Sequence, residues 1–322
     1  MLAATYNEYG SSEVLHVGLR PMPRRGQHQL LIEVHASSVN PIDYRMRRGE
    51  LKGILPGGFP RTPGYDVAGV VAAAPADSTY VPGDRVVAFL DDRRGGALAE
   101  YAVCSPNVAA KLPSDIPFEV AAAIPLAGST ALQSLRDHGH LQSGQRVLIN
   151  GASGGVGVFA VQIAKAMGAN VDAVASANNE TFCLELGADR FFNYRDVDFT
   201  ELPERWDLVF DAAGKSDYLS VRKVLTDHGR YVTTEPDAVG ILTTLLTWPL
   251  GKSGRAMLAK PNGADLSTLI EMYQQGELRV VIDSAYALSE AAAAHRRVET
   301  GVDRGKVVVV NHPETEFESR PE

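Results

Sequence analysis

The sequence predicts an α/β protein in which a doubly wound parallel sheet of six strands adjoins a mostly β domain. Strand-like and helix-like segments alternate from residue 146 to residue 260, as in parallel sheets whose strands are connected by helices. A glycine-rich turn, "GASGGVG", separates the first of these strands from the first helix. Residues 1–120 instead hold short segments rich in valine and aromatic side chains, separated by glycine and proline, which predict β structure.

Each element of the parallel sheet has its own sequence signal. Residues 146–150 are a short apolar run that suits a buried parallel strand, and residues 156–167 carry apolar side chains at helical spacing. The strands are expected at residues 146–150, 170–176, 190–194, 208–213, 230–234 and 256–260, and the helices at 155–168, 179–187, 216–226 and about 238–248. Beyond them, residues 265–278 look helical and "GKVVVV" looks like a strand, so we expect the end of the chain to return to the first domain.

Composition indicates a protein with a large core. The chain has 322 residues, of which 45% are hydrophobic and 22% charged, which is enough to build two domains. A formal net charge of −8 argues against a nucleic-acid surface, and the basic cluster at residues 45–49 is interpreted as local. The two cysteines, Cys104 and Cys183, are too few for a disulfide scaffold and agree with a reducing cytoplasm.

No transmembrane segment is expected. The N-terminus lacks a basic-then-apolar signal pattern, and the longest strongly apolar stretch, residues 239–251, is shorter than the ~20 residues that span a bilayer. We interpret this stretch as a helix that lines a substrate site or a subunit contact. Peripheral membrane contact through Trp248 is the alternative.

The glycine-rich turn predicts a phosphate site. Gly151, Gly154 and Gly157 form G-x-x-G-x-x-G, which is one residue longer in its first gap than the dinucleotide-binding G-x-G-x-x-G. Glycine lets a ligand approach the main chain, and the unpaired N–H groups at the start of the next helix attract an anion. A second strand follows at the βαβ distance, so a dinucleotide pyrophosphate is the expected ligand. The alternative is a tight strand-to-helix turn that binds nothing.

Segments in order along nearly the whole chain carry a family resemblance: "VNPIDYRMRRG", "PGYDVAGVV", "AAAIPLAGSTALQSL", "GASGGVGVFAVQIAKAMGA" and "RGKVVVV". They resemble the medium-chain dehydrogenase/reductase superfamily. "KPNGADLSTLIEMYQQGELRVVID" narrows the resemblance to its zinc-independent quinone oxidoreductase branch, in the group of the chloroplast envelope quinone oxidoreductase homologue and the mitochondrial reticulon-4-interacting protein. The resemblance implies a GroES-like domain of residues 1–122 completed by residues 262–322, a Rossmann domain of residues 123–261, an active site in the cleft between them, and a homodimer.

Zinc-dependent members of the superfamily take one zinc ligand from a Cys-His-x-Asp segment and another from a Gly-His-Glu segment. The corresponding positions here look like Asn40, followed by Pro41 and Asp43, and Tyr65. The eight histidines show no metal-binding spacing. We therefore expect no bound metal, and metal analysis tests the alternative of a zinc-dependent alcohol dehydrogenase.

Without a Lewis acid, reduction of an activated acceptor is easier than oxidation of an alcohol. A quinone or an α,β-unsaturated carbonyl accepts a hydride at carbon and spreads the new charge onto oxygen, so the protein must hold it and donate hydrogen bonds. The resemblance implies that Asn40, Tyr44 and Arg45 face the nicotinamide and such a small electrophilic acceptor. Alternatively, Asn40 and Asp43 merely fix a turn beside Pro41.

Two other functions stay open. Some enoyl-thioester reductases of the superfamily carry a catalytic tyrosine two residues after the glycine that corresponds to Gly49, and this chain has Leu51 there. The other alternative is a nucleotide-binding scaffold with vestigial catalysis. Turnover of NADPH with a panel of acceptors distinguishes this scaffold from an enzyme.

The end of the second strand bears on the cofactor preference. NAD-binding sites place an acidic residue there, whereas this chain has Ser176 at the tip. A 2′-phosphate would meet no repulsion at the tip, and the resemblance adds Tyr194 as a second hydrogen-bond donor. We therefore expect NADPH in preference to NADH, although the Arg or Lys often found near Asn178 in relatives is missing and Glu180 opposes a phosphate.

The motif and the resemblance together assign cofactor binding to twelve residues. These are Thr130, Gly151, Ser153, Gly154, Gly155, Val156, Gly157, Ser176, Tyr194, Ala213, Gly214 and Lys306. Thr130 is expected under the nicotinamide ribose or ring, with capping of a helix start as its alternative. Ala213 and Gly214 are expected near the riboses, where a bulky side chain would block the cofactor. Lys306 is expected to reach a cofactor phosphate, with an ordinary solvated lysine as the alternative.

Overall fold

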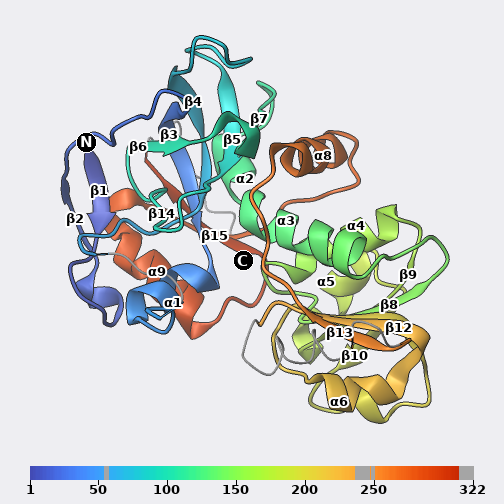
Figure 1. Cartoon of the computed structure of the whole chain (residues 1–322). Coiled ribbons are helices and arrows are strands. Elements are labelled where there is room, and N and C mark those ends of the chain that lie inside the picture. The colour runs from blue at the N-terminus through green and yellow to red at the C-terminus, as the bar shows by residue number, and fades with distance from the viewer. Residues whose placement is uncertain (54–57, 236–246, 248–250, 312–322) are drawn as a thin grey trace.

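The computed structural model describes residues 1–53, 58–235, 247 and 251–311. Its described part has two halves, each built on its own large sheet, and three helices lie where the halves meet (Figure 1). These helices are α3 (Pro125–Gln133), α4 (Gly157–Ala166) and α8 (Gly263–Gln274).

The first large sheet is parallel and has six strands. They are β8 (Arg146–Asn150), β9 (Asn170–Ala175), β10 (Arg190–Asn193), β11 (Trp206–Asp211), β12 (Leu225–Thr233) and β13 (Ser253–Ala256). Their spatial order is β10-β9-β8-β11-β12-β13, so the strands stand in the order 3-2-1-4-5-6. This is the order of a doubly wound dinucleotide-binding sheet, and the predicted fold class is confirmed.

Both faces of this sheet are buried, which explains its nearly continuous apolar strands. In β8, Val147 and Ile149 belong to the core shared with α3 and α4, whereas Leu148 points to the opposite face. On that opposite face lie Trp206, the first residue of β11, and Val221, the last residue of α6 (Tyr218–Val221). Helices therefore cover both faces, as right-handed crossovers require.

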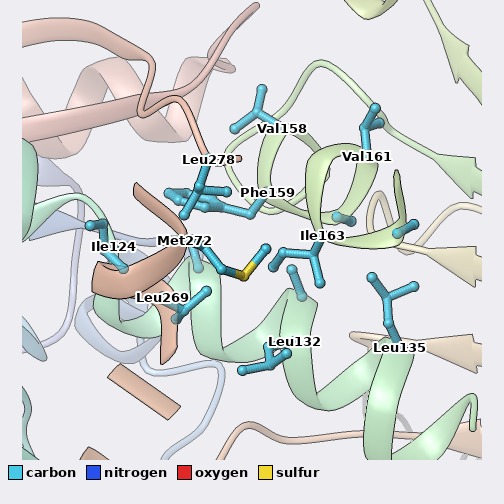
Figure 2. Packing of buried hydrophobic residues seen from close by; sticks show 14 of the residues in the cluster. Ile124, Leu132, Leu135, Val158, Phe159, Val161, Ile163, Leu269, Met272 and Leu278 are labelled. Carbon is cyan, nitrogen blue, oxygen red and sulfur yellow. The ribbon is translucent and has the colours of Figure 1, made fainter. Parts of the chain in front are cut away.

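Apolar side chains hold the three junction helices together (Figure 2). Leu132 of α3, Phe159 of α4 and Leu269 of α8 are buried in one cluster. A β-carbon at Gly128 of α3 would lie 2.9 Å from Leu269 Cδ1, so the bare glycine lets α8 pack closely. The start of α4, which follows the glycine-rich turn, is thereby fixed relative to both halves.

The second large sheet is mostly antiparallel and has seven strands. They are β3 (Leu30–Val39), β4 (Asp66–Ala73), β5 (Arg85–Phe89), β6 (Tyr101–Cys104), β7 (Ala109–Lys111), β14 (Ile282–Ala287) and β15 (Lys306–Val310). The order is β14-β15-β3-β4-β5-β7, with β6 also paired to β3. Because β15 pairs with β3, the end of the chain completes a sheet that its first third begins. The predicted domain boundaries at residues 122 and 261 stay a prediction.

The other strands and α-helices of the described residues surround these sheets. They are the paired strands β1 (Leu2–Thr5) and β2 (His16–Leu19) and the helices α1 (Pro41–Arg48), α2 (Phe118–Ala122), α5 (Glu180–Glu185) and α9 (Ala291–Thr300). Helices α1 and α9 contact each other on the side of the seven-stranded sheet where β15 lies (Figure 1). Among the described residues, none of the helices is long and apolar enough to cross a membrane.

Two expectations need correction. The sixth strand was expected at residues 256–260, but it covers Ser253–Ala256, because pairing with β12 and not apolar composition sets its register. The buried Met257 then fills the core just beyond the strand. Helix α1 lies in the part of the chain that was expected to be mostly β, where the sequence analysis assigned no helix. The helix predicted at about 238–248 and the apolar stretch 239–251 lie outside the described residues, apart from Thr247 and Gly251.

Candidate functional site

The glycine-rich turn connects β8 to α4 at the carboxyl end of the parallel sheet. Gly151 has φ +84°, which is the left-handed region that glycine tolerates. A β-carbon at this position would also lie 2.9 Å from Ala213 Cβ, at the end of the neighbouring strand β11. Position 151 therefore requires glycine for two reasons: the positive backbone angle and the close packing against Ala213.

Gly154 and Gly157 differ in what surrounds them. A β-carbon at Gly157 would lie 2.0 Å from the Gly151 carbonyl oxygen, so this glycine is needed for packing within the turn. A β-carbon at Gly154 would meet no atom nearer than the Gly151 oxygen at 3.5 Å. Packing thus leaves Gly154 unexplained, and a ligand that approaches the main chain explains it.

The turn lies where the strand order of the sheet reverses. The N–H groups of Gly151 and Ala152 donate to Val174 O of β9, and the Ala213 N–H donates to Asn150 O of β8. These bonds join the carboxyl ends of β8, β9 and β11, and the order changes direction between β8 and β11. Open α/β sheets bind ligands at this switch point.

The start of α4 supplies hydrogen-bond donors to this place. Val156 is the N-cap of α4, and Gly157 is its first helical residue. Two of the first four N–H groups of α4 are already bonded to the turn, since Val158 donates to Gly154 O and Ala160 donates to Val156 O. The helix dipole adds positive charge beside the donors that remain. Together with the open backbone at Gly154, this arrangement fits a dinucleotide pyrophosphate.

The C-terminal segment lies against the same turn. The Gly305 N–H donates to Ser153 O over 3.1 Å. A β-carbon at Gly155 would lie 3.3 Å from both Gly305 O and Lys306 Cδ. The segment that leads into β15 therefore forms one wall of the candidate cofactor site.

At the other end of this site, Ser176 and Tyr194 follow β9 and β10. Ser176 Oγ accepts a hydrogen bond from Asn179 Nδ2 over 2.9 Å, and the Tyr194 N–H donates to Ala175 O. The Tyr194 side chain is 55% exposed. The structure thus brings these two predicted residues together at the carboxyl edge of the sheet.

A buried polar cluster lies at the start of α1, and Asp66 is its centre. The Asp66 carboxylate accepts from Asn40 Nδ2 over 2.7 Å and from the Leu126 N–H of α3 over 2.7 Å. Lys306 Nζ lies 3.7 Å from the Asp66 carboxylate and donates to Asn40 Oδ1. Burial lowers the pKa of Lys306, and the nearby carboxylates oppose this shift. The cluster joins α1 and β4 to α3 and β15.

This cluster determines how two of the predicted residues are presented. Asn40 is 1% exposed, and both its amide oxygen and its amide nitrogen bind within the cluster. Lys306 is 3% exposed and points into the same cluster. The surroundings exclude the alternative of an ordinary solvated lysine, whereas contact of either side chain with a ligand stays a prediction.

Asp43 fixes the start of α1. One carboxylate oxygen accepts from the Asn40 N–H over 2.8 Å, and the other accepts from the Gly64 N–H over 3.0 Å. Complete burial raises the pKa of Asp43 to about 7, although these hydrogen bonds oppose the shift. Asp43 therefore caps the start of α1. This agrees with the alternative that Asp43 has a structural role beside Pro41.

Tyr44 and Arg45 lie on the first turn and a half of α1. Arg45 forms a two-pronged ion pair with Glu235, at 2.8 and 3.1 Å, and its Nε binds Glu50 over 3.1 Å. Glu235 follows β12, so this ion pair connects the two halves. Partial burial raises the pKa of Tyr44, so its phenol keeps its proton at neutral pH.

Thr130 and Gly214 complete the set of predicted residues. Thr130 lies in the second turn of α3, and its Oγ1 donates to Leu126 O over 2.7 Å, so capping of the helix start is the wrong alternative. Gly214 has φ +62°, and a β-carbon there would lie 3.3 Å from Glu235 Cβ. Gly214 is therefore close to the ion pair between Arg45 and Glu235.

Two family models match the chain. Residues 26–114 match the alcohol dehydrogenase GroES-like domain, and residues 186–309 match the zinc-binding dehydrogenase family. The chain is 32% identical to the chloroplast envelope quinone oxidoreductase homolog of Arabidopsis thaliana over 96% of this chain and 98% of that protein. The chain belongs to the medium-chain dehydrogenase/reductase superfamily.

Two further similarities place it within this superfamily. The chain is 32% identical to the chloroplastic NADPH-dependent alkenal/one oxidoreductase of Arabidopsis thaliana, over 97% of this chain and 80% of that protein. It matches the structure of the quinone oxidoreductase from Coxiella burnetii with a TM-score of 0.88 and 32% identity, covering 97% of this chain and 99% of that one. The resemblance to the quinone oxidoreductase branch is confirmed.

In this medium-chain dehydrogenase/reductase, the positions expected to match zinc ligands serve other purposes. Asn40 binds Asp66 and Lys306, and the Tyr65 hydroxyl donates to Arg93 O over 2.9 Å. Within the described ranges, no group of three or more His, Cys, Asp or Glu side chains is placed to hold a metal ion. Absence of zinc stays a prediction that metal analysis of the purified protein tests.

Sequence reasoning missed three residues of this site. Asp66 was noted only as the residue after Tyr65. Glu235 was not considered, nor was Arg304, whose side chain donates to Asn179 Oδ1 and Asn178 O beside Ser176. A carboxylate at the start of the buried strand "DVAGVV" was a usable signal, because a buried charge needs a partner. Local sequence holds no comparable signal for Glu235 or Arg304, since their partners lie far away along the chain.

Proposed function

We propose that this chain is an NADPH-dependent, zinc-independent reductase that transfers a hydride to a quinone or an α,β-unsaturated carbonyl. The single observation that carries the proposal is Gly154, whose missing side chain leaves open space beside the start of α4. An anionic dinucleotide fits this place by both shape and charge. The names of two relatives, one a quinone oxidoreductase homologue and one an NADPH-dependent alkenal/one oxidoreductase, support the same chemistry.

Each predicted cofactor residue receives a place in this proposal. The pyrophosphate is surrounded by Gly151, Ser153, Gly154, Gly155, Val156 and Gly157. The 2′-phosphate accepts hydrogen bonds from Ser176 and Tyr194. Ala213 and Gly214 lie near the riboses, and Thr130 lies under the nicotinamide ribose or ring. Bound NADPH supplies the hydride. Lys306 orients Asn40 and reaches toward the phosphates from the buried cluster, supported by its contact with Gly155.

The acceptor is held by residues at the start of α1. Tyr44 donates a hydrogen bond to the oxygen on which negative charge develops, since its raised pKa keeps the phenol protonated. Arg45 adds a positive charge beside that oxygen. Asn40 is a positioning residue, because its amide is engaged with Asp66 and Lys306 and holds the start of α1 in place.

Two alternatives compete with this function. A nucleotide-binding scaffold would use the same glycine-rich turn without turnover. An enoyl-thioester reductase would act on a thioester, but the tyrosine expected two residues after Gly49 is replaced by Leu51, which packs against the core. One experiment distinguishes the proposed function from both alternatives.

The experiment measures NADPH oxidation with a quinone, a 2-alkenal, an enone and an enoyl thioester. We expect steady turnover with the first three acceptors above the rate without acceptor. Tyr44→Phe is expected to lower kcat by about 10²-fold, as for loss of one donor to an oxyanion. Tyr101→Phe, on strand β6 of the seven-stranded sheet and outside α1 and the glycine-rich turn, is the matched control and is expected to keep full activity. Tight NADPH binding without any turnover favours the scaffold, and turnover of the thioester alone favours the second alternative.

We also propose which parts of the chain bind the acceptor and the cofactor, that the chain forms a homodimer, and where it is located in the cell. Residues 1–122 and 262–322 form the part that binds the acceptor, and residues 123–261 form the part that binds most of the cofactor, which Lys306 also reaches from the C-terminal segment. A homodimer is supported by β13, which ends the six-stranded sheet and offers an edge for pairing. A cytoplasmic location is supported by the two free, buried cysteines. Light scattering tests the dimer, and cell fractionation tests the location, for which an organelle is the competing result.

A further inference from the structure

Arg304 lies at the carboxyl end of β9, although it follows that strand by more than a hundred residues. Its Nε donates to Asn179 Oδ1 over 2.6 Å, and its Nη2 donates to Asn178 O over 2.7 Å. The guanidinium carbon also lies 4.8 Å from the centre of the Phe182 ring. Three contacts therefore fix the plane of this guanidinium beside the tip of the strand.

The main chain around Arg304 is equally constrained. Gly305 has φ +70°, and a β-carbon there would lie 2.2 Å from Val281 O. The Gly305 N–H donates to Ser153 O in the glycine-rich turn. The residue after Arg304 is therefore bound to the turn that is proposed to surround the pyrophosphate. From this anchor, the Arg304 side chain extends along the edge of the sheet.

Asn179 connects Arg304 to Ser176. This asparagine is 1% exposed, its Oδ1 accepts from Arg304, and its Nδ2 donates to Ser176 Oγ over 2.9 Å. Because Ser176 Oγ accepts that bond, its own proton is left to donate. Among the described residues, no group binds Arg304 Nη1. A hydroxyl donor and a guanidinium donor are therefore held together at one place.

An acidic residue also lies near this pair. Asp303 Oδ1 accepts from Asn179 Nδ2 over 2.8 Å, and its carboxylate lies 3.9 Å from Arg304 Nε. Asp303 is 63% exposed, so solvent screens its charge. It weakens, but does not cancel, the attraction of this place for an anion.

We propose that Arg304, held by Asn179 and acting with the Ser176 hydroxyl, binds the 2′-phosphate of NADPH and makes the chain prefer NADPH to NADH. The inference rests on the proposed function for the presence of the dinucleotide. An arginine fork suits a phosphate because its N–H groups match two phosphate oxygens. Arg304 thereby supplies the cation that is missing from the sequence around Asn178.

The test measures binding, so it does not depend on turnover. Calorimetry and nucleotide fluorescence give Kd for NADPH, NADH and adenosine 2′,5′-bisphosphate, with wild type and Arg304→Gln. We expect Arg304→Gln to raise Kd for NADPH and for the bisphosphate about 10- to 100-fold, as for loss of a charged hydrogen bond. Kd for NADH is expected to stay within about twofold. Arg24→Gln, an exposed site that removes the same charge, is the matched control.

Asp303→Asn tests the same proposal in the opposite direction. Removal of this carboxylate is expected to lower Kd for NADPH about 2- to 5-fold and to leave Kd for NADH unchanged. The reason is that the negative charge of Asp303 repels the 2′-phosphate, which NADH lacks. This variant keeps Arg304. It therefore decides the question even if circular dichroism shows that Arg304→Gln is unfolded. Unchanged NADPH and bisphosphate affinity in Asp303→Asn would then overturn the proposal.

Three other results also decide the question. Equal losses for NADPH and NADH in folded Arg304→Gln would mean that Arg304 contacts the adenine and would overturn phosphate selection. An unchanged Kd for NADPH in folded Arg304→Gln would overturn it as well. If wild type binds NADPH in either case, only this inference fails. If wild type binds neither nucleotide, both this inference and the proposed function fail.

Discussion

At the scale of single residues, Asp66 is the carboxylate that connects the two halves. It accepts hydrogen bonds from Asn40, beside the seven-stranded sheet, and from the Leu126 N–H of α3, and it lies 3.7 Å from Lys306 Nζ. All the side chains of this cluster are nearly excluded from solvent. A buried carboxylate of this kind is tolerated because a cation and several donors neutralise and solvate it.

Lys306→Met is expected to lower the free energy of unfolding by about 3–5 kcal/mol, because the buried Asp66 side chain would lose the cation that lies 3.7 Å away. Urea unfolding followed by circular dichroism measures the change. Lys111→Met is the control: Lys111 pairs with Asp84 at 2.9 Å on the surface, and its loss is expected to cost about 0–1 kcal/mol. Similar losses in both variants would contradict the account of the cluster.

Asp43 predicts a pH dependence of stability. Its pKa is raised from 3.8 to about 7 by burial, so the folded state holds a proton that the unfolded state releases between pH 4 and pH 7. The contribution of this group to stability is therefore complete below pH 4 and decreases as pH rises toward 7. Urea unfolding at pH 5 and pH 8 is expected to show it as lower stability at pH 8.

Asp43→Asn separates this group from all others that titrate. An amide does not titrate, so the variant is expected to lose the part of the pH dependence that Asp43 causes. Its stability is also expected to be lower at every pH, because the amide NH2 faces the N–H of Asn40 or Gly64. An identical slope with pH in both proteins would show that Asp43 is ionised in the folded state throughout.

At the scale of elements, the turn between β8 and α4 predicts different effects on stability for two similar substitutions. Gly157→Ala would bring a methyl group to 2.0 Å from Gly151 O, so we expect a loss of stability of about 1–3 kcal/mol. Gly154→Ala meets no atom closer than 3.5 Å, so we expect a nearly unchanged melting temperature. Thermal unfolding of both variants measures this difference, and equal destabilisation would contradict it.

The same turn shows how far the sequence predicts this element. The apolar run of β8, the glycines and the helical spacing of α4 are all local, so the strand, turn and helix were predicted at nearly the observed residues. Helix α1 was missed, although Pro41 at its first position and Asp43 at its third are helix-start signals. Strand β13 was misplaced because its limits depend on pairing with β12, which is a tertiary contact.

At the scale of the whole molecule, three contacts tie the halves together near the candidate active site. Leu126 binds Asp66, Gly305 binds Ser153, and Arg45 pairs with Glu235. Apart from helix α1, which carries Arg45, the sequence predicted the elements near these residues. It did not predict the contacts, because each contact joins residues at least 60 positions apart. The cation near Asn178 was not predicted from the sequence for the same reason, since Arg304 arrives from the far end of the chain.

The pair between Arg45 and Glu235 gives a prediction about catalysis. Both side chains are 30–40% exposed, so breaking the pair is expected to cost only about 0–1 kcal/mol of stability. Arg45→Gln is expected to lower kcat/KM for the acceptor about 10-fold or more, because it removes a charge beside the developing oxyanion. Glu235→Gln breaks the same pair and keeps Arg45. Equal losses of kcat/KM in these two variants would show that Arg45 acts only as a link between the halves.

The central claim is that the glycine-rich turn holds a dinucleotide pyrophosphate at Gly154. Calorimetric titration of NADPH into wild type and Gly154→Ala, both confirmed as folded by thermal unfolding, tests it most directly. We predict saturable binding with one nucleotide per chain in wild type and a loss of affinity of at least about 10-fold in Gly154→Ala, because the methyl group occupies the space of the phosphates. Wild type that binds no reduced nucleotide, or Gly154→Ala that binds as tightly as wild type, would contradict the claim.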